Sequence, residues 1–149
     1  MVESVTRIDL LSSGMKIVLD EEAGAIFEII FPDKDVSDWK TNDGSIIGKL
    51  TLNDNTFLFL GDAPAKIEEY LVRRDGAKLD TDILKIGHHG SRTSSSEEFL
   101  RAVTPNEAVI SVGKNNRYGH PHREVLERLS ALNIKTLRTD QQGTIIFKL

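Results

Sequence analysis

The residues of this chain that are best suited to catalysis or metal binding are its histidines. The sequence holds four histidines, His88, His89, His120 and His122, and none lies in the first 87 residues. Imidazole is a frequent zinc ligand, and its unperturbed pKa lets it gain or lose a proton near neutral pH. The clustering therefore indicates metal binding or acid–base chemistry in the second half of the chain.

Three short polar loops follow apolar, strand-like runs. They contain Asp62 after residues 57–60, His88-His89 after residues 83–86, and His120-Pro121-His122 after residues 108–112. If these strands lie side by side and run the same way, one carboxylate and four imidazoles meet at one edge of a sheet. A carboxylate with histidines is the ligand set of a hydrolytic zinc or manganese site.

Each of these groups also has an interpretation without chemistry. Asp62 fits equally well as the N-cap of a helix. One histidine of the adjacent pair could be buried and hydrogen-bonded while the other is exposed. His120 and His122 could flank a rigid proline turn, or could donate to a substrate phosphate or act as a general acid.

Cations lie close to the histidines in the sequence. Arg92, Lys114 and Arg117 would suit an anionic substrate, although each is individually typical of a solvated surface. The chain as a whole has 19 basic and 23 acidic residues, a net charge of −4. This balance excludes a global positive field that would attract nucleic acid or an anionic membrane, so any nucleic-acid contact must be local.

Length and composition indicate one domain with a real core. The chain has 149 residues, of which 39% are hydrophobic, enough for a folded interior. Cysteine is absent, which excludes disulfides, thiolate zinc sites and cysteine nucleophiles. Neither a membrane-spanning apolar run nor a signal-peptide pattern is found, so we expect a soluble segment, cytoplasmic if free-standing.

The apolar pattern predicts a β-rich first half and alternating strands and helices in the second. The expected strands cover residues 5–11, 15–20, 24–31, 45–52, 56–60, 83–86, 108–112, 134–138 and 144–148. The expected helices cover residues 63–74, 94–103 with a cap at Ser94 or Ser95, and 123–132, and residues 32–42 are expected to form a loop. This order predicts an α+β fold, a mixed sheet covered by helices on one side.

Five segments together carry a family resemblance. They are NDGSIIGKL from Asn42, FLFLGD from Phe57, ILKIGHHGSRTS from Ile83, AVISVGKNNRYGHPH from Ala108 and RTDQQGTIIF from Arg138. In this order they resemble the metallo-β-lactamase superfamily, and more closely its branch that includes the catalytic domain of ComEC-type competence proteins. The resemblance implies a metal-dependent hydrolase acting on phosphodiester bonds, with DNA as a substrate linked to DNA uptake in competence.

The resemblance also implies roles for particular residues. Asp62 would bridge two metal ions, zinc or manganese, and His88 would bind the second metal. His89, His120 and His122 would be catalytic. The implied substrate-binding residues are Ser91, Arg92, Asn116 and Tyr118. The parent could be a membrane protein, and the segment could then be extracytoplasmic or membrane-associated, although this segment itself shows no membrane contact.

The chain departs from the family in one large respect. The family's histidine-rich metal motif belongs in the first half of the domain, and no histidine precedes His88. Residues 1–149 are therefore expected to form a single domain equivalent to the C-terminal half of a metallo-β-lactamase-like αββα sandwich, inactive by itself. An apolar face would remain uncovered, which predicts a homo-oligomer or a missing N-terminal half. The residues expected on it are Phe57, Phe59, Ile83, Ile110 and Val112.

Two other functions are compatible with the sequence. One is a non-catalytic binding or assembly module that retains the half-fold. The other is a hydrolase of small esters or phosphonates.

Overall fold

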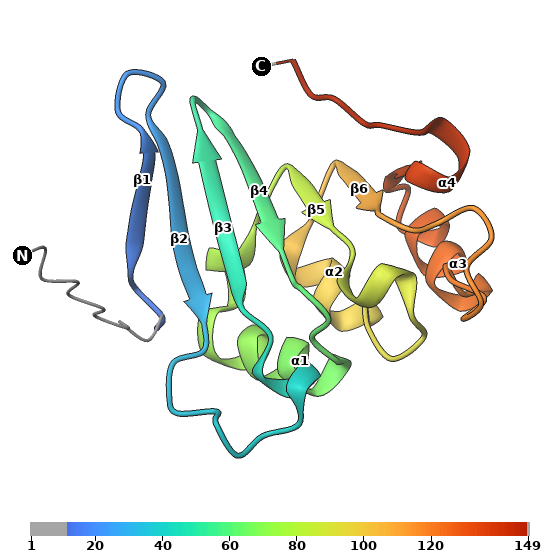
Figure 1. Ribbon diagram of the computed structural model, residues 1–149, viewed down its shortest axis with the longest axis horizontal. Coiled ribbons are helices and arrows are strands. Elements are labelled where there is room, and N and C mark those ends of the chain that lie inside the picture. Colours follow the sequence, from blue (N-terminus) through green and yellow to red (C-terminus); the bar gives the residue numbers. More distant parts are fainter. Residues whose placement is uncertain (1–11, 149) are drawn as a thin grey trace, which may run out of the picture.

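A computed structural model describes residues 12–148, which form one seven-stranded sheet in the order β1-β2-β3-β4-β5-β6-β7 (Figure 1). The strands are β1 (Lys16–Asp20), β2 (Ala25–Phe31), β3 (Ile47–Leu52), β4 (Asn55–Phe59), β5 (Ile83–Lys85), β6 (Glu107–Ile110) and β7 (Lys135–Arg138). Neighbours in the sequence are thus neighbours in the sheet, which is the simplest topology for such a chain.

The sheet changes from antiparallel to parallel at β4. Strands β1 to β4 pair antiparallel, and β4 to β7 pair parallel. The turn between β3 and β4 places Asn53 at φ 52°, a left-handed angle that asparagine tolerates better than most residues. Parallel neighbours need long crossovers, and the three crossovers here each contain a helix.

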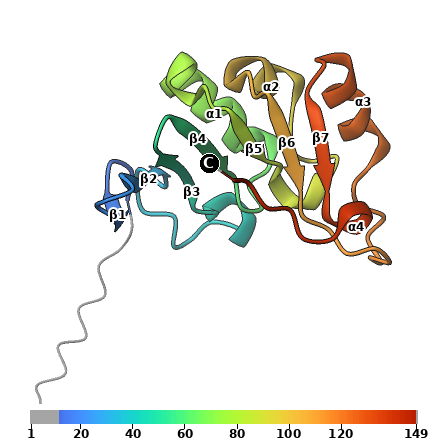
Figure 2. The same cartoon turned by 90° about the horizontal axis from the view of Figure 1, so that it is seen from above.

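The helices that connect the parallel strands all cover one face of the sheet (Figure 2). They are α1 (Ala65–Asp75), α2 (Glu97–Val103) and α3 (Arg123–Ala131). The remaining helical turns are η1 (Thr41–Gly44), η2 (Gly76–Leu79), η3 (Gly87–Gly90) and α4 (Thr139–Gln142). The predicted α+β class, with a mixed sheet and helices on one side, is therefore confirmed.

The main core lies between the sheet and these helices. Leu58, Leu84 and Ala108 are in register across β4, β5 and β6 and are fully buried. Leu71 of α1 and Phe99 of α2 close over this face and are also fully buried. Alternation along the strands then directs the remaining strand residues to the opposite face.

The opposite face of the sheet carries a second, smaller apolar cluster. Phe57 and Ile83 are paired across β4 and β5 and are 9% and 8% exposed. The C-terminal segment crosses this face (Figure 2), and the rings of Phe147 and Phe57 lie 5.6 Å apart in an edge-to-face arrangement. We refer to this side, with Leu50, Phe57, Phe59, Ile83 and Val109, as the open face.

Two residues expected on the open face lie elsewhere. Ile110 is fully buried in the core under the helices, and Val112 packs against that same core. The correction follows from strand alternation, because Val109 takes the position on the open face and its neighbour Ile110 must point the other way.

The chain end also differs from the prediction. Residues 144–148 form no strand, and Thr139–Gln142 forms the short helix α4 instead. The Arg138 side chain bonds both carboxylate oxygens of Asp140, at 3.0 and 2.6 Å, which favours a turn directly after β7. The apolar residues that follow therefore cross the open face rather than pair with β7.

Other expectations can be compared element by element. The strands predicted at 15–20, 24–31, 45–52 and 56–60 and the helices predicted at 63–74 and 123–132 are confirmed within a few residues. The strand expected at residues 5–11 lies outside the described residues. Within residues 12–148, no helix combines the length and apolarity needed to cross a membrane.

Helix α2 begins later than predicted, after Ser96. The Ser96 hydroxyl accepts a hydrogen bond from the Phe99 amide at 3.3 Å. Ser94 cannot cap because its hydroxyl donates to the carbonyls of Gly87 and Ser91, at 2.9 and 3.1 Å. The cap at Ser94 or Ser95 was therefore a wrong prediction, since Ser94 is engaged by the histidine loop.

Candidate functional site

The carboxyl ends of three parallel strands bring the predicted site residues to one edge of the sheet. Strands β4, β5 and β6 are adjacent and parallel, and each is followed by one of the polar loops (Figure 1). The amide of His88 donates to the carbonyl of Gly61 at 3.0 Å, which joins the first two loops. We call the resulting group, Asp62 with the four histidines, the histidine rim.

Asp62 lies closest to His89 within this rim. The Asp62 carboxylate and the His89 Nε2 are 3.7 Å apart, and the two side chains are 44% and 51% exposed. The Nδ1 of His89 lies 2.7 Å from the carbonyl oxygen of Ser111. Because a carbonyl can only accept, Nδ1 carries the hydrogen, and Nε2 is left free to bind a metal or a proton beside Asp62.

Asp62 does not cap a helix. The residue at the N-cap position of α1 is Pro64, and no side chain caps that helix. The Asp62 amide donates to the Ser45 hydroxyl at 3.2 Å, which fixes the loop while the carboxylate stays at the surface. The interpretation of Asp62 as an N-cap is therefore wrong.

The His88-His89 backbone is strained. Both residues have left-handed angles, with φ 47° and φ 54°, a conformation that costs free energy outside glycine. The His88 ring lies edge-to-face with the His120 ring at 5.7 Å, and its Nδ1 is 3.5 Å from the Thr93 hydroxyl. The fold thus holds two adjacent imidazoles in an unfavourable backbone, a pattern often found at functional sites.

The third loop docks directly on the second. The His122 amide donates to the Gly90 carbonyl at 2.9 Å, and the Arg92 amide donates to the His122 Nδ1 at 3.2 Å. A Cβ atom at Gly90 would lie 2.6 Å from the Cβ of Pro121. Glycine is therefore required at position 90, where φ is also positive at 82°.

His120 lies between other imidazoles. Its ring centroid is 4.8 Å from that of His122 and 5.8 Å from that of Tyr118, with which it stacks. Burial lowers the pKa of His120, and the charges of neighbouring histidines lower it further. The pKa direction favours the neutral ring, the form that accepts a proton or binds a metal.

The four predicted substrate-binding residues divide into two pairs. Arg92 and Tyr118 are exposed at the rim, Tyr118 by 64%. Ser91 is buried, and its hydroxyl lies 3.0 Å from that of Thr93. Asn116 secures its own loop by donating to the His120 carbonyl at 2.6 Å and accepting from the His120 amide at 2.9 Å.

Glu68 of α1 holds the segment that follows the histidine loop and gave no signal in the sequence. Its two carboxylate oxygens accept from the amides of Ser95 and Ser96, at 2.5 and 2.9 Å. Arg128 of α3 donates to the carbonyls of Ser94 and Ser95, at 3.1 and 2.7 Å. Burial raises the pKa of Glu68, although the two amide hydrogen bonds oppose that rise.

Lys85, at the end of β5, is a second residue that the sequence analysis missed. Its ammonium donates to the Ile86 carbonyl at 2.9 Å. Burial lowers the pKa of Lys85, whereas the charge of Asp62 acts in the opposite direction. A strand lysine gave no local signal, because only the parallel pairing of β4 with β5 brings its charge near Asp62.

The described residues do not complete a metal site. Among residues 12–148, no group of three or more histidine, aspartate or glutamate side chains is placed to hold a metal ion. Asp62 and His89 form a pair, whereas a catalytic zinc usually has three protein ligands. The rim therefore supplies part of such a ligand set.

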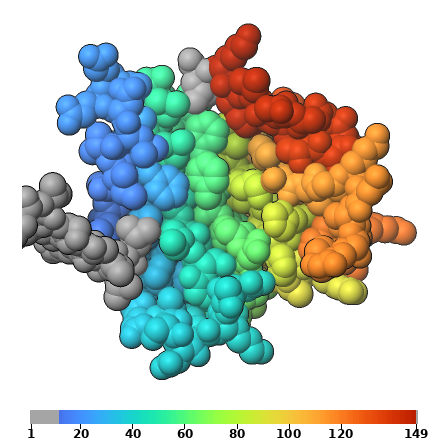
Figure 3. Space-filling model, in the orientation of Figure 1, coloured from blue at the N-terminus to red at the C-terminus, as the bar shows by residue number. Residues whose placement is uncertain are grey.

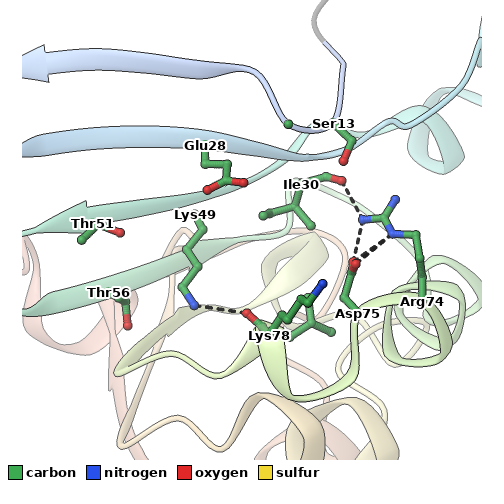
Figure 4. A pocket seen from close by; sticks show the side chains of 11 residues that line it. Ser13, Glu28, Ile30, Lys49, Thr51, Thr56, Arg74, Asp75 and Lys78 are labelled. Carbon is green, nitrogen blue, oxygen red and sulfur yellow. Dashed lines mark hydrogen bonds and ion pairs between the residues drawn. The ribbon is translucent and has the colours of Figure 1, made fainter.

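A polar pocket of about 470 Å3 lies near the C-terminal end of α1, away from Asp62 (Figure 4). The Lys49 ammonium donates to the Lys78 carbonyl at 3.3 Å, and Arg74 donates to the Ile30 carbonyl at 2.8 Å and to Asp75 at 2.6 Å. These contacts join β2 and β3 to the end of α1. Two cations of this pocket, Lys49 and Arg74, are thus engaged in holding the fold together.

The chain is similar to segments of competence and recombination proteins. It is 40% identical over 107 residues to ComE operon protein 3 of Bacillus subtilis, 72% of this chain and 14% of that protein. It is 41% identical over 128 residues to competence protein ComA of Neisseria gonorrhoeae, 85% of this chain and 18% of that protein. It is 40% identical over 122 residues to recombination protein 2 of Haemophilus influenzae, 82% of this chain and 15% of that protein.

These relatives correct the expected membership of the metallo-β-lactamase superfamily. A scan of family models finds none that matches the chain. The superfamily resemblance was based on five short segments, whereas the similarity to the competence and recombination proteins covers 72–85% of the chain. The chain is thus similar over most of its length to one segment of competence proteins, and it spans only 14–18% of the length of these relatives.

Proposed function

We propose that this chain acts in competence, in the handling of DNA during uptake, and that the histidine rim is its DNA-processing surface. The observation that carries the proposal is the convergence of Asp62 and four histidines at the carboxyl ends of three parallel strands. The similarity to proteins named for competence and recombination supports the same direction.

The finer proposal is that the rim is one part of a metal-dependent phosphodiesterase site. Asp62 and His89 offer a carboxylate and a free Nε2 that are 3.7 Å apart, and His88 contacts His120 beside them. Further ligands would have to come from outside residues 12–148. By themselves, the described residues should bind zinc or manganese weakly, because affinity depends on the number of preorganised ligands.

Substrate binding in this proposal relies on the exposed part of the rim. A phosphodiester is anionic, and the guanidinium of Arg92 lies at the surface one residue after Ser91. Burial and the charges of neighbouring histidines lower the pKa of His120, which favours the unprotonated ring that a general base needs. Tyr118 offers an exposed ring beside it.

Calorimetric titration with zinc and with manganese tests the metal proposal. We expect weak binding that is lost in Asp62→Ala and reduced in both His88→Ala and His89→Ala. Asp54→Ala is the matched control, because Asp54 is an exposed carboxylate at the other end of β4. Tight stoichiometric binding that survives Asp62→Ala and both histidine variants would refute the assignment of these ligands.

Hydrolysis of bis-p-nitrophenyl phosphate and of DNA tests activity. We expect no metal-dependent turnover by the chain alone, since hydroxide formation needs a firmly held ion with an open coordination position. Turnover that is abolished by His89→Ala would contradict the view that the site is incomplete.

A second candidate function is a non-catalytic DNA-binding module. It is favoured by the lack of any three-ligand group among residues 12–148. The two functions differ in their response to chelator. DNA binding that is unchanged by EDTA and by Asp62→Ala would favour the module, whereas binding that requires added metal would favour the phosphodiesterase site.

A further inference from the structure

A second pocket of the molecule combines aromatic rings with cations. It has a volume of about 500 Å3 and lies between the loop of residues 32–44 and α1. Its lining residues are Asp38, Trp39, Lys40, Asp43, Lys66, Ile67, Tyr70 and Arg73. We call it the tryptophan pocket.

The aromatic part of the pocket is buried at its base and partly exposed above it. The rings of Trp39 and Tyr70 each lie 6.2 Å from that of Phe31, which is fully buried. Trp39 is nevertheless 38% exposed. The ammonium of Lys34 lies 5.1 Å from the Trp39 ring and 5.0 Å from the Tyr70 ring. An exposed lysine is thus the group that now contacts both rings.

Cations slightly outnumber carboxylates in the lining of this pocket. Three of the lining residues are cations and two are carboxylates, on a chain whose net charge is −4. One of the carboxylates, Asp43, is buried and already paired with Lys66. Lys40 and Arg73, which also line the pocket, are exposed.

The segments that line the pocket also lead to the histidine rim. Asp43 lines the pocket, and two residues later the Ser45 hydroxyl accepts the amide of Asp62. Lys66 of the pocket lies four residues after Asp62, at the start of α1. Figure 3 shows the loop, in cyan, along the same end of the molecule as the yellow segment that follows β5.

We propose that the tryptophan pocket binds a nucleotide of single-stranded DNA next to the histidine rim. The base stacks on Trp39 and Tyr70, and the backbone phosphates contact Lys34, Lys40 and Arg73. Exposed aromatic rings beside cations are the usual platform for single strands, because every base offers a flat face and every linkage offers a charge. Duplex DNA should bind poorly, since its bases are already stacked. This inference rests on the proposed function and names its substrate.

The test uses a property of the sequence, because Trp39 is the single tryptophan of the chain. Its fluorescence therefore reports on this pocket alone. Titration with an oligothymidylate of about 12 nucleotides should quench the emission in a saturable way. The same sequence as a duplex should give little quenching. Affinity by anisotropy of a labelled oligonucleotide should fall about 5- to 150-fold in Trp39→Ala.

Further variants make the test specific. Arg73→Gln should weaken binding, and Trp39→Phe should weaken it less than Trp39→Ala because a ring remains. Lys78→Gln is the matched control for Arg73→Gln, because Lys78 is an exposed cation after the far end of α1. Circular dichroism of each variant checks that the fold is kept.

Several outcomes would overturn the inference. They are the absence of quenching, equal binding of duplex, and affinity that is unchanged in both Trp39→Ala and Arg73→Gln. Quenching by choline but not by the oligonucleotide would show a cation-binding cage instead, since Lys34 already occupies that position.

The inference and the proposed function can fail separately. Metal binding that is lost in Asp62→Ala, together with Trp39 fluorescence that single strands do not quench, would refute only the tryptophan pocket. Quenching of Trp39 by single strands, together with metal binding that is indifferent to the rim variants, would refute only the metal-dependent site.

Discussion

The two faces of the sheet are built from the same strands and are covered very differently. Leu58, Leu84 and Ala108 point under three helices and are fully buried. Phe57 and Ile83, one residue away on the same strands, rely on Phe147 and are 9% and 8% exposed. Leu50 and Phe59 beside them are only partly buried.

The difference teaches that strand alternation alone does not predict stability. The central strands carry apolar residues on both faces, but only one face is covered by helices. The other depends on one aromatic contact from the chain end. Loss of packing on the first face should therefore cost far more free energy than loss on the second.

The largest effect is expected for truncation under the helices. Leu58→Ala should lower the free energy of unfolding by about 2–5 kcal/mol, because it opens a cavity in a closed core. The matched change Leu50→Ala, on the open face, should lower it by less, about 1 kcal/mol. Urea denaturation measures both, and equal losses would show that the two faces are equally covered.

A smaller effect is expected at the chain end. Phe147→Ala should lower the free energy of unfolding by about 1–2 kcal/mol, since it removes an edge-to-face pair and its partial burial. Ile146→Ala is the control, because Ile146 is 75% exposed. Equal effects of the two changes would show that Phe147 contributes no more than a solvated residue.

The open face also makes a prediction about association. Apolar surface of this kind favours contact with another chain, so we expect light scattering to show self-association that increases in Phe147→Ala. Strands β1 and β2 extend the edge of the sheet and do not fold over this face. A stable monomer that binds no apolar dye, both as wild type and as Phe147→Ala, would contradict the prediction.

The smallest effect is expected from the buried carboxyl of the helix layer, and it depends on pH. Burial raises the pKa of Glu68 above its usual value of 4.5, so the folded state holds this proton more firmly than the unfolded state. The stability gained from the protonated carboxyl is complete below about pH 4.5 and is lost as pH rises through the raised pKa.

This direction of the pH dependence can be tested against a variant whose side chain does not titrate. The deficit of Glu68→Gln in unfolding free energy, about 1 kcal/mol, should be largest in acid and should shrink as pH rises. Glu69→Gln, an exposed neighbour on α1, should show no such trend. A deficit that grows with pH would mean that the Ser95 and Ser96 amides and Arg128 outweigh the cost of burial.

Much of the fold followed from local patterns. The turn at Asn53, the helical spacing of Ile67 and Leu71, and the apolar runs before the polar loops each predicted the element observed. The failures were at positions where a distant contact decides the outcome. Ser94 does not cap α2 because its hydroxyl donates to the Gly87 carbonyl. The last apolar residues pack on the open face and do not form a strand.

The same division holds for the site. By itself, the sequence determined that Asp62 and the four histidines follow strand ends, because residue type and apolar periodicity are local properties. Only the tertiary structure decided that Asp62 faces His89, that Glu68 accepts from the Ser95 amide, and that Trp39 and Tyr70 share one pocket. These pairings join segments 25 or more residues apart, and strand order and helix packing, which no local pattern encodes, bring them together.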